Sequence, residues 1–245
     1  MIIFRLNATD LILLTHEIRR QAGRNDIKFD AFGHSMGAML ICCAQILSPG
    51  LFRRAVLVEP VIFPVNSLGR GTFPLVTIAA KRRPSFASQE EALENFKSKE
   101  VFRQWDSRCL SAFLTDLCRY CLIFFTDSIY HHHLDNYVKY GLVQKNGVYA
   151  LKCTPEWESL TFKENETNGA WELIEKGLQF EYPPVLVCGK NTTTYPEKYR
   201  AILAKKLGAH LIEMPDADHF VPMTHPEATA KIIIDTFSNH TTPCL

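Results

Sequence analysis

A serine flanked by two spaced glycines, in the stretch GHSMG (residues 33–37), constrains the fold of this chain more than any other feature. It follows a short apolar run, Ile27–Phe32, and precedes apolar residues at helical spacing. A strand that becomes a helix within so few residues forces the serine into a strained backbone, and a side chain at either glycine would collide with the neighbouring chain. The stretch therefore predicts a strand–turn–helix unit that presents Ser35 at the turn. The alternative is an ordinary helix with a serine N-cap.

Apolar runs alternate with helical patterns in much of the chain. Strands are predicted at Ile27–Phe32, Arg54–Pro60, Pro183–Lys190 and Ala209–Pro215. Helices are predicted after an N-cap at Asn7 and Asp10, from Met36, from Pro196 to Gly208, and after a cap at Thr224. This alternation is typical of an α/β fold with four parallel strands and flanking helices.

The middle of the chain, residues 61–180, shows no strand–helix alternation. It contains a capping box at Ser88 and Glu91 and many aromatic residues, so we expect a helical lid inserted after the second strand. The α/β core is then formed by residues 1–60 and 181–245. A length of 245 residues suffices for one domain with such an insertion.

Composition excludes several function classes. Hydrophobic residues make up 47% and charged residues 22%, as in ordinary globular proteins, and the net charge of +1 gives no argument for nucleic acid. The longest apolar stretch, near Cys121–Phe125, is too short to span a bilayer. The eight cysteines are irregularly spaced, which indicates reduced thiols in an intracellular protein. Cys118, Cys121 and His131–His133 fit no zinc-finger spacing closely, so no metal is expected.

A nucleophilic serine needs a base, and His219 is the best-placed histidine. It lies four residues past the end of the last predicted strand, in a loop at the strand's carboxyl end. His34 lies inside the turn itself, and the remaining histidines fall on predicted helices, a strand, a cap or the insertion. The helix beginning at Met36 would direct its dipole at the reaction centre, and the Met36 amide is a candidate oxyanion donor.

The third partner, an acid that orients the imidazole, is less obvious. The loop after the third predicted strand reads GKNTTTYP, with Thr193 where an aspartate would be expected. Glu59 ends the second strand, beside the serine strand, and is our choice, although a strand-end glutamate in a surface salt bridge is the alternative. Asp216 and Asp218 are reserve candidates that share a tight loop with His219.

Taken in this order, these residues resemble the α/β-hydrolase fold family. More narrowly, several stretches are similar to fungal peroxisomal-lipase and toxin-biosynthesis hydrolases, from about Leu11 to Phe237. These are GHSMGA (33–38), LVEPVIF (57–63), RRPSF (82–86), YVKYGL…LKCTPE (137–156) and DADHFVPMTHPE (216–227). The resemblance implies Ser35 as nucleophile, His219 as base and Glu59 as acid.

The function expected from this combination is a serine esterase or lipase-like hydrolase. It would cleave an ester in an apolar small molecule or lipid, with no metal or organic cofactor. Aromatic residues such as Phe63 and Trp105, together with His34, are candidate substrate contacts, although aromatics at this density usually pack on one another. Cytoplasm is the default location. A peroxisome would follow from family analogy alone, since the C-terminal PCL lacks a basic middle residue.

Two departures from the family pattern suggest a second reading. The family has strands ahead of the serine turn, with a loop that supplies a second oxyanion donor, whereas this chain starts at the helix before the serine strand. The stretch Ser111–His133 also interrupts the family pattern. We therefore expect an incomplete or mis-spliced version of a longer hydrolase. The alternative function is an impaired hydrolase-like domain that acts by binding or needs a partner.

Overall fold

A computed structural model gives the structure of the chain, and it describes residues 2–64, 74–105, 141–165 and 169–238. It divides into two compact units. The first consists of Met1–Ser67, Thr167–Val221 and Glu227–Leu245, and the second of Leu68–Glu166 and Pro222–Pro226.

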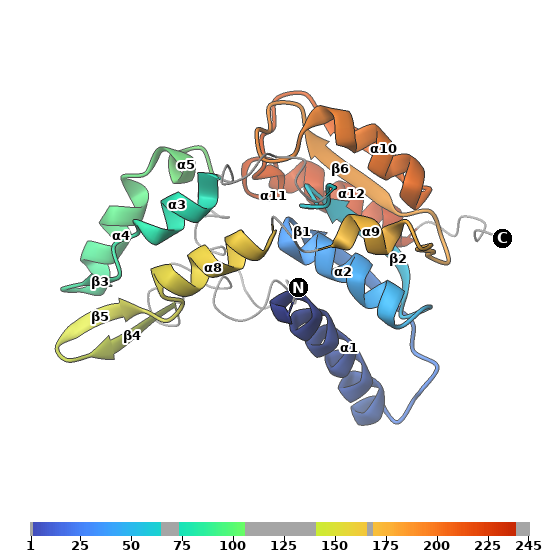
Figure 1. The fold of residues 1–245 in the computed structure, drawn as a ribbon, viewed down its shortest axis with the longest axis horizontal. Helices are drawn as coiled ribbons and strands as arrows, with labels where there is room; N and C mark the ends of the chain where they lie inside the picture. Colours follow the sequence, from blue (N-terminus) through green and yellow to red (C-terminus); the bar gives the residue numbers. More distant parts are fainter. Residues whose placement is uncertain (1, 65–73, 106–140, 166–168, 239–245) are drawn as a thin grey trace. The chain divides into compact units, whose positions relative to one another are not determined.

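The first unit is built on a four-stranded parallel sheet with strand order β1-β2-β6-β7 (Figure 1). The prediction of four parallel strands is confirmed, with boundaries shifted by about two residues. The strands are β1 (Phe29–His34), β2 (Phe52–Val58), β6 (Val185–Gly189) and β7 (His210–Met214). The helices are α1 (Ile2–Ala22), α2 (Met36–Leu47), α9 (Ala170–Ile174), α10 (Glu197–Leu207) and α12 (Pro226–Ser238). The short helix α11 (Val221–Thr224) begins at the last residue of this unit's second segment.

Helices cover both faces of this sheet. Phe32 of β1 packs in a cluster with Ile232, Ile233 and Phe237 of α12, whereas a side chain at the next residue, Gly33, would contact α2. Because successive strand residues point to opposite faces, α12 and α2 lie on opposite sides of the sheet. Strand β2 is buried along almost its whole length, as a strand covered on both faces must be.

Helix α1 differs from the prediction at its start. It begins at Ile2, so the predicted N-cap at Asn7 and Asp10 is wrong, and both residues lie inside the helix. Asp10 is exposed to solvent there, where a polar side chain costs little. The helix ends as predicted, because Gly23 adopts a left-handed φ of 64°.

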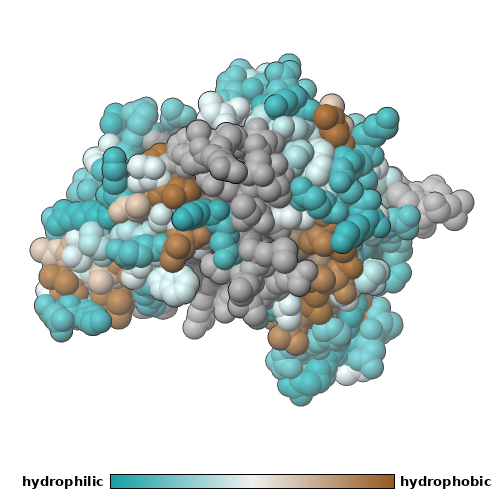
Figure 2. Space-filling model, in the orientation of Figure 1, coloured by the Kyte–Doolittle hydropathy of each residue, from teal (hydrophilic) through white to brown (hydrophobic). Residues whose placement is uncertain are grey.

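Helix α10 shows how burial follows the sequence pattern. Its buried residues, Arg200, Leu203, Ala204 and Leu207, recur at helical spacing, and Gly208 ends it in the left-handed conformation. Lys205 and Lys206 are exposed, and Figure 2 shows mostly hydrophilic residues over this helix.

The second unit combines helices with a small antiparallel sheet of order β3-β5-β4, so the segment expected to be helical is mixed. Its strands are β3 (Ser85–Phe86), β4 (Leu142–Lys145) and β5 (Val148–Leu151), and its helices are α3 (Pro74–Ala80), α4 (Gln89–Lys97), α5 (Glu100–Arg103) and α8 (Pro155–Asn165). The predicted cap is confirmed, since the Ser88 side chain accepts a hydrogen bond from the Glu91 N–H. Phe86 and Phe96 pack in the core of this unit with ring centroids 5.7 Å apart.

None of the helices in the described ranges is both long and apolar enough to cross a membrane. The stretch Ser111–His133, including Cys118, Cys121 and His131–His133, lies outside the described residues. Cys42, Cys43 and Cys188 are buried, and Cys153 is exposed.

Candidate active site

Ser35 occupies the sharp turn between β1 and α2, with φ 54° and ψ −120°. Its N–H donates to the Val58 carbonyl of the neighbouring strand at 2.9 Å, and its side chain makes no capping bond to the helix. A Cβ placed on Gly33 would lie 2.7 Å from the backbone of both Gly37 and Ala38. The glycine is therefore required for the turn, and Ser35 precedes α2 without its side chain capping the helix.

His219 lies in the loop after β7, and its imidazole meets Ser35 directly. Its Nε2 is 3.0 Å from the Ser35 Oγ, and its Nδ1 is 3.0 Å from the Glu59 Oε2. The side chain is almost fully buried. The structure thus brings together the serine, the histidine and the glutamate that the sequence singled out.

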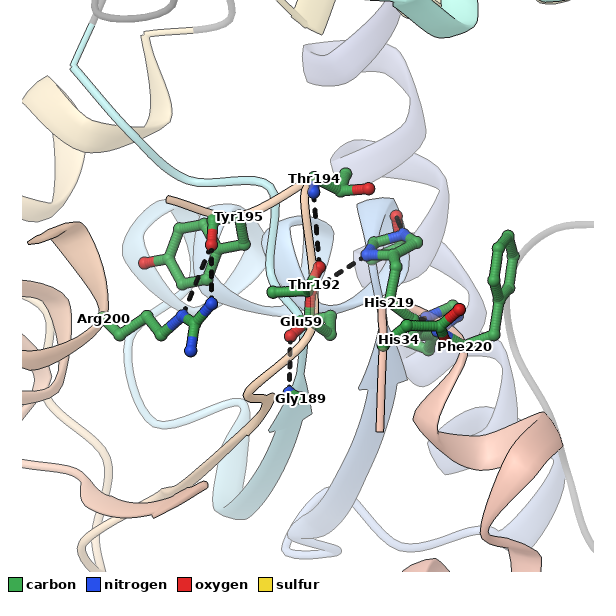
Figure 3. A network of polar contacts seen from close by, with 11 residues as sticks. His34, Glu59, Gly189, Thr192, Thr194, Tyr195, Arg200, His219 and Phe220 are labelled. Atoms are coloured by element: carbon green, nitrogen blue, oxygen red, sulfur yellow. Dashed lines mark hydrogen bonds and ion pairs between the residues drawn. The ribbon is translucent and has the colours of Figure 1, made fainter. Parts of the chain in front are cut away.

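Glu59 is the first residue after β2, and it is wholly buried rather than in a surface salt bridge. Its Oε1 accepts from the Gly189 N–H at 2.8 Å, and its Oε2 accepts from the Thr192 hydroxyl at 2.8 Å as well as facing His219 (Figure 3). Its φ of 49° is left-handed, which is costly for a residue with a long side chain. Strained backbone of this kind persists where surrounding contacts impose it, and it clusters at functional sites.

The hydrogen bonds fix which imidazole nitrogen carries the proton. A carboxylate can only accept, so the proton between Glu59 and His219 belongs to Nδ1. The unprotonated Nε2 then accepts from the hydroxyl of Ser35. This arrangement is suited to removing a proton from Ser35 as it attacks an electrophile.

His34 contacts His219 from the side. Its Nε2–H donates to the His219 carbonyl at 2.7 Å, and the two ring centroids are 4.9 Å apart. Burial, with a smaller contribution from the nearby His219, lowers the pKa of His34 to about 3. His34 is therefore neutral at physiological pH. Its hydrogen bond to the His219 carbonyl holds in place the loop of residues 215–220, which we call the histidine loop.

The other candidate residues are placed as follows. Met36 is the first residue of α2, so its N–H has no acceptor within the helix. Phe63 is buried in the first unit, and Trp105 is buried in the second. Asp216 is exposed, and Asp218 Oδ1 accepts from the Phe220 N–H, a contact that shapes the loop around His219.

Two residues that sequence reasoning did not select, Gly189 and Thr192, complete the site. Gly189 is the last residue of β6, and Thr192 lies in the loop that follows, which packs against the histidine loop. The Asn191 N–H donates to the Ala217 carbonyl at 2.9 Å, and the Lys190 N–H donates to the Met214 carbonyl at 2.9 Å. The glycine at the end of a strand was the available signal, because it often marks close approach of another backbone.

Gly189→Ala is expected to lower the free energy of unfolding by about 1–3 kcal/mol and to lower activity as well. The new Cβ would lie 2.3 Å from the Asp218 carbonyl oxygen and 2.4 Å from that of Ala217, so the histidine loop must move. Urea unfolding measures the change. Gly50→Ala is the control. A Cβ added at Gly50 meets no atom within 4 Å, so this substitution costs only the strain of a left-handed backbone, about 1 kcal/mol. Equal losses in the two variants would contradict the steric explanation.

Within the described ranges, no cluster of three or more histidine, cysteine, aspartate or glutamate side chains is placed to hold a metal ion.

Comparison with known proteins places this geometry in context. The model of the alpha/beta hydrolase family matches residues 4–232. Among curated proteins, the abhydrolase domain-containing protein AKT2 of Alternaria alternata is 24% identical over 221 residues, which cover 83% of this chain and 80% of the relative.

Two solved structures illustrate the similarity in fold. The peroxisomal alpha-beta-hydrolase Lpx1 from Saccharomyces cerevisiae superimposes with a TM-score of 0.71 at 18% identity, covering 94% of this chain. The chain spans 59% of the length of Lpx1. E-2-(acetamidomethylene)succinate hydrolase gives a TM-score of 0.65 at 14% identity, covering 95% of this chain and 72% of that one.

Proposed function

The chain belongs to the alpha/beta hydrolase family, and from that premise we propose that it is a serine hydrolase that cleaves a carboxylic ester. The observation that carries the proposal is the continuous series of hydrogen bonds from Ser35 through His219 to Glu59. Each residue follows the carboxyl end of a different parallel strand, which is where open α/β sheets hold their reactive groups. The roles are nucleophile, base and orienting acid, respectively.

The reaction would proceed in two halves. Ser35 Oγ attacks the ester carbonyl while its proton passes to His219 Nε2, which gives a tetrahedral intermediate. Its collapse breaks the bond to the alkoxy oxygen, and the alcohol leaves with the proton from Nε2. Water then attacks the acyl-serine by the same route, which releases the acid and restores Ser35. Throughout, Glu59 holds the Nδ1–H and stabilises the imidazolium that forms.

The oxyanion formed in each half needs hydrogen-bond donors. The Met36 N–H is our candidate, because it directly follows the nucleophile at the N-terminus of α2 and lacks an acceptor within that helix. The dipole of α2 favours negative charge at the same point. One donor of this type accounts for about 100- to 1000-fold in turnover.

For the substrate, we propose an ester of an apolar small molecule or a lipid. The family resemblance, the buried Phe63 and the aromatic-rich insertion favour an apolar partner over a charged one. Structures of similar fold include a marine microorganism esterase and the thioesterase domain from the curacin biosynthetic pathway, both of which act on acyl groups by their names.

Labelling with a fluorophosphonate probe tests the proposal, because such probes react only with activated serines. Wild-type protein is expected to label and Ser35→Ala is not. Ser98→Ala removes an exposed hydroxyl that donates to the Asn95 carbonyl of the preceding helix, and this variant should label like wild type. If wild type labels no better than Ser35→Ala, the enzyme proposal fails, and the alternative of a hydrolase-like domain that acts by binding replaces it.

A further inference from the structure

We propose that Thr192 is a positioning residue that holds the carboxylate of Glu59 in its working orientation. The proposal rests on the proposed function, since it assigns Glu59 the role of triad acid. Thr192 lies in the loop after β6, three residues beyond the end of the strand. It adds to the site a hydroxyl that hydrogen-bonds Glu59.

The contact is direct and buried. The Thr192 Oγ1 lies 2.8 Å from Glu59 Oε2, the same oxygen that faces His219 Nδ1 at 3.0 Å (Figure 3). The other oxygen, Oε1, is held by the Gly189 N–H at 2.8 Å. Both oxygens are thus tied to the end of β6 and the loop that follows it, and the carboxylate plane cannot rotate without breaking a hydrogen bond.

The direction of the hydroxyl proton is fixed by a neighbour. The Thr194 N–H points to Thr192 Oγ1 at 3.3 Å, so that oxygen accepts from the backbone. Its own proton must then go to Glu59, because a carboxylate oxygen can only accept. Thr192 therefore acts toward Glu59 solely as a donor.

The loop that carries Thr192 is anchored at its far end by Arg200 of α10. The Arg200 guanidinium is buried and donates twice to the Tyr195 carbonyl at 3.3 Å, and once to Glu213 Oε1 at 3.2 Å. Tyr195 itself is completely buried. With Gly189 at one end and Tyr195 at the other, the hydroxyl of Thr192 has little freedom of position.

The energetic reason for such a residue lies in the burial of Glu59. A wholly buried carboxylate needs donors on both oxygens, and hydrogen bonds to charged groups are stronger than neutral ones. Catalytic geometry must be held to about 0.5 Å by residues whose own positions are locked. Without the hydroxyl, Oε2 loses one of the two hydrogen bonds described for it and keeps the one to His219 Nδ1, so the carboxylate can rotate away from Nδ1.

Thr192→Val tests the proposal, since valine keeps the shape and removes the hydroxyl. With a p-nitrophenyl ester as substrate, we expect kcat to fall by about 10- to 100-fold while KM changes by less than about 2-fold. Thr192→Ser, which keeps the donor, should restore kcat to within about 3-fold of wild type. Thr193→Val is the matched control, because Thr193 is the exposed neighbour and should behave like wild type.

A second comparison isolates the action through Glu59. In the Glu59→Gln background, Thr192→Val is expected to lower residual activity by less than about 3-fold, because no carboxylate remains to be placed. A purely structural role would lower activity equally in both backgrounds, which would overturn the proposal. Circular dichroism checks folding, and Thr192→Ala replaces the valine variant if that one does not fold.

The outcomes separate this proposal from the proposed function. If wild type labels with the fluorophosphonate probe and Thr192→Val keeps wild-type kcat, the positioning role is wrong while the hydrolase stands. Equal losses in the folded valine and serine variants would also overturn it. If wild type fails to label at Ser35, both proposals fall together.

Discussion

His219→Ala is expected to lower kcat by about a million-fold. Without the imidazole, nothing accepts the proton from Ser35 Oγ, and a neutral hydroxyl is a poor nucleophile near pH 7. The removed side chain lies 3.0 Å from both of its partners, so the loss breaks the whole series of hydrogen bonds at its centre. Turnover of a p-nitrophenyl ester and the rate of fluorophosphonate labelling both measure it.

The histidine variant has a control and a clear contrary result. His210→Ala changes an exposed histidine on β7, the strand that leads into the same loop, and should leave kcat within about 2-fold. KM is expected to change little in either variant, because neither side chain is assigned to substrate binding. Retention of a tenth or more of kcat in His219→Ala would mean that another group serves as base.

Glu59→Gln should lower kcat by about 10,000-fold with the fold intact. The glutamine amide can donate a hydrogen bond where the carboxylate only accepted, which favours the tautomer with the proton on Nε2 of His219. That nitrogen then cannot accept from Ser35. The measurement is again kcat, together with thermal unfolding to show that the variant remains native.

Asp218→Asn is the matched control for the acid. It makes the same chemical change one residue before His219, and its Oδ1 can still accept from the Phe220 N–H. We expect kcat within about 3-fold of wild type. If Asp218→Asn is the more damaging change, the acid is Asp218 and the role of Glu59 is structural.

Much of the fold could be predicted from the sequence, and the errors have physical causes. Four parallel strands and the turn at Ser35 stand out because apolar runs and glycine spacing report local geometry directly. The alpha/beta hydrolase resemblance is confirmed by the family match. The hairpin of β4 and β5 was missed, although Asn146 and Gly147, with φ of 52° and 78°, form a turn of the type that Asn-Gly favours.

The three residues of the candidate site that follow the carboxyl ends of strands could be predicted from the sequence. The order of strands places Ser35, Glu59 and His219 at one edge of the sheet, because the carboxyl ends of parallel strands meet there. Thr192 was not predictable. Three threonines follow one another in that loop, and only the tertiary structure shows that Thr192 is buried while Thr193 is exposed.

The residues of the site lie far apart in the sequence, and this determines at what stage of folding the site can form. The contacts that build it join residues 130, 133, 160 and 184 positions apart. Contacts of such range form only after extended stretches of chain have been brought together at an entropic cost. No short peptide from this sequence can reproduce the constellation, and a nascent chain remains inert until its C-terminal portion has emerged and docked.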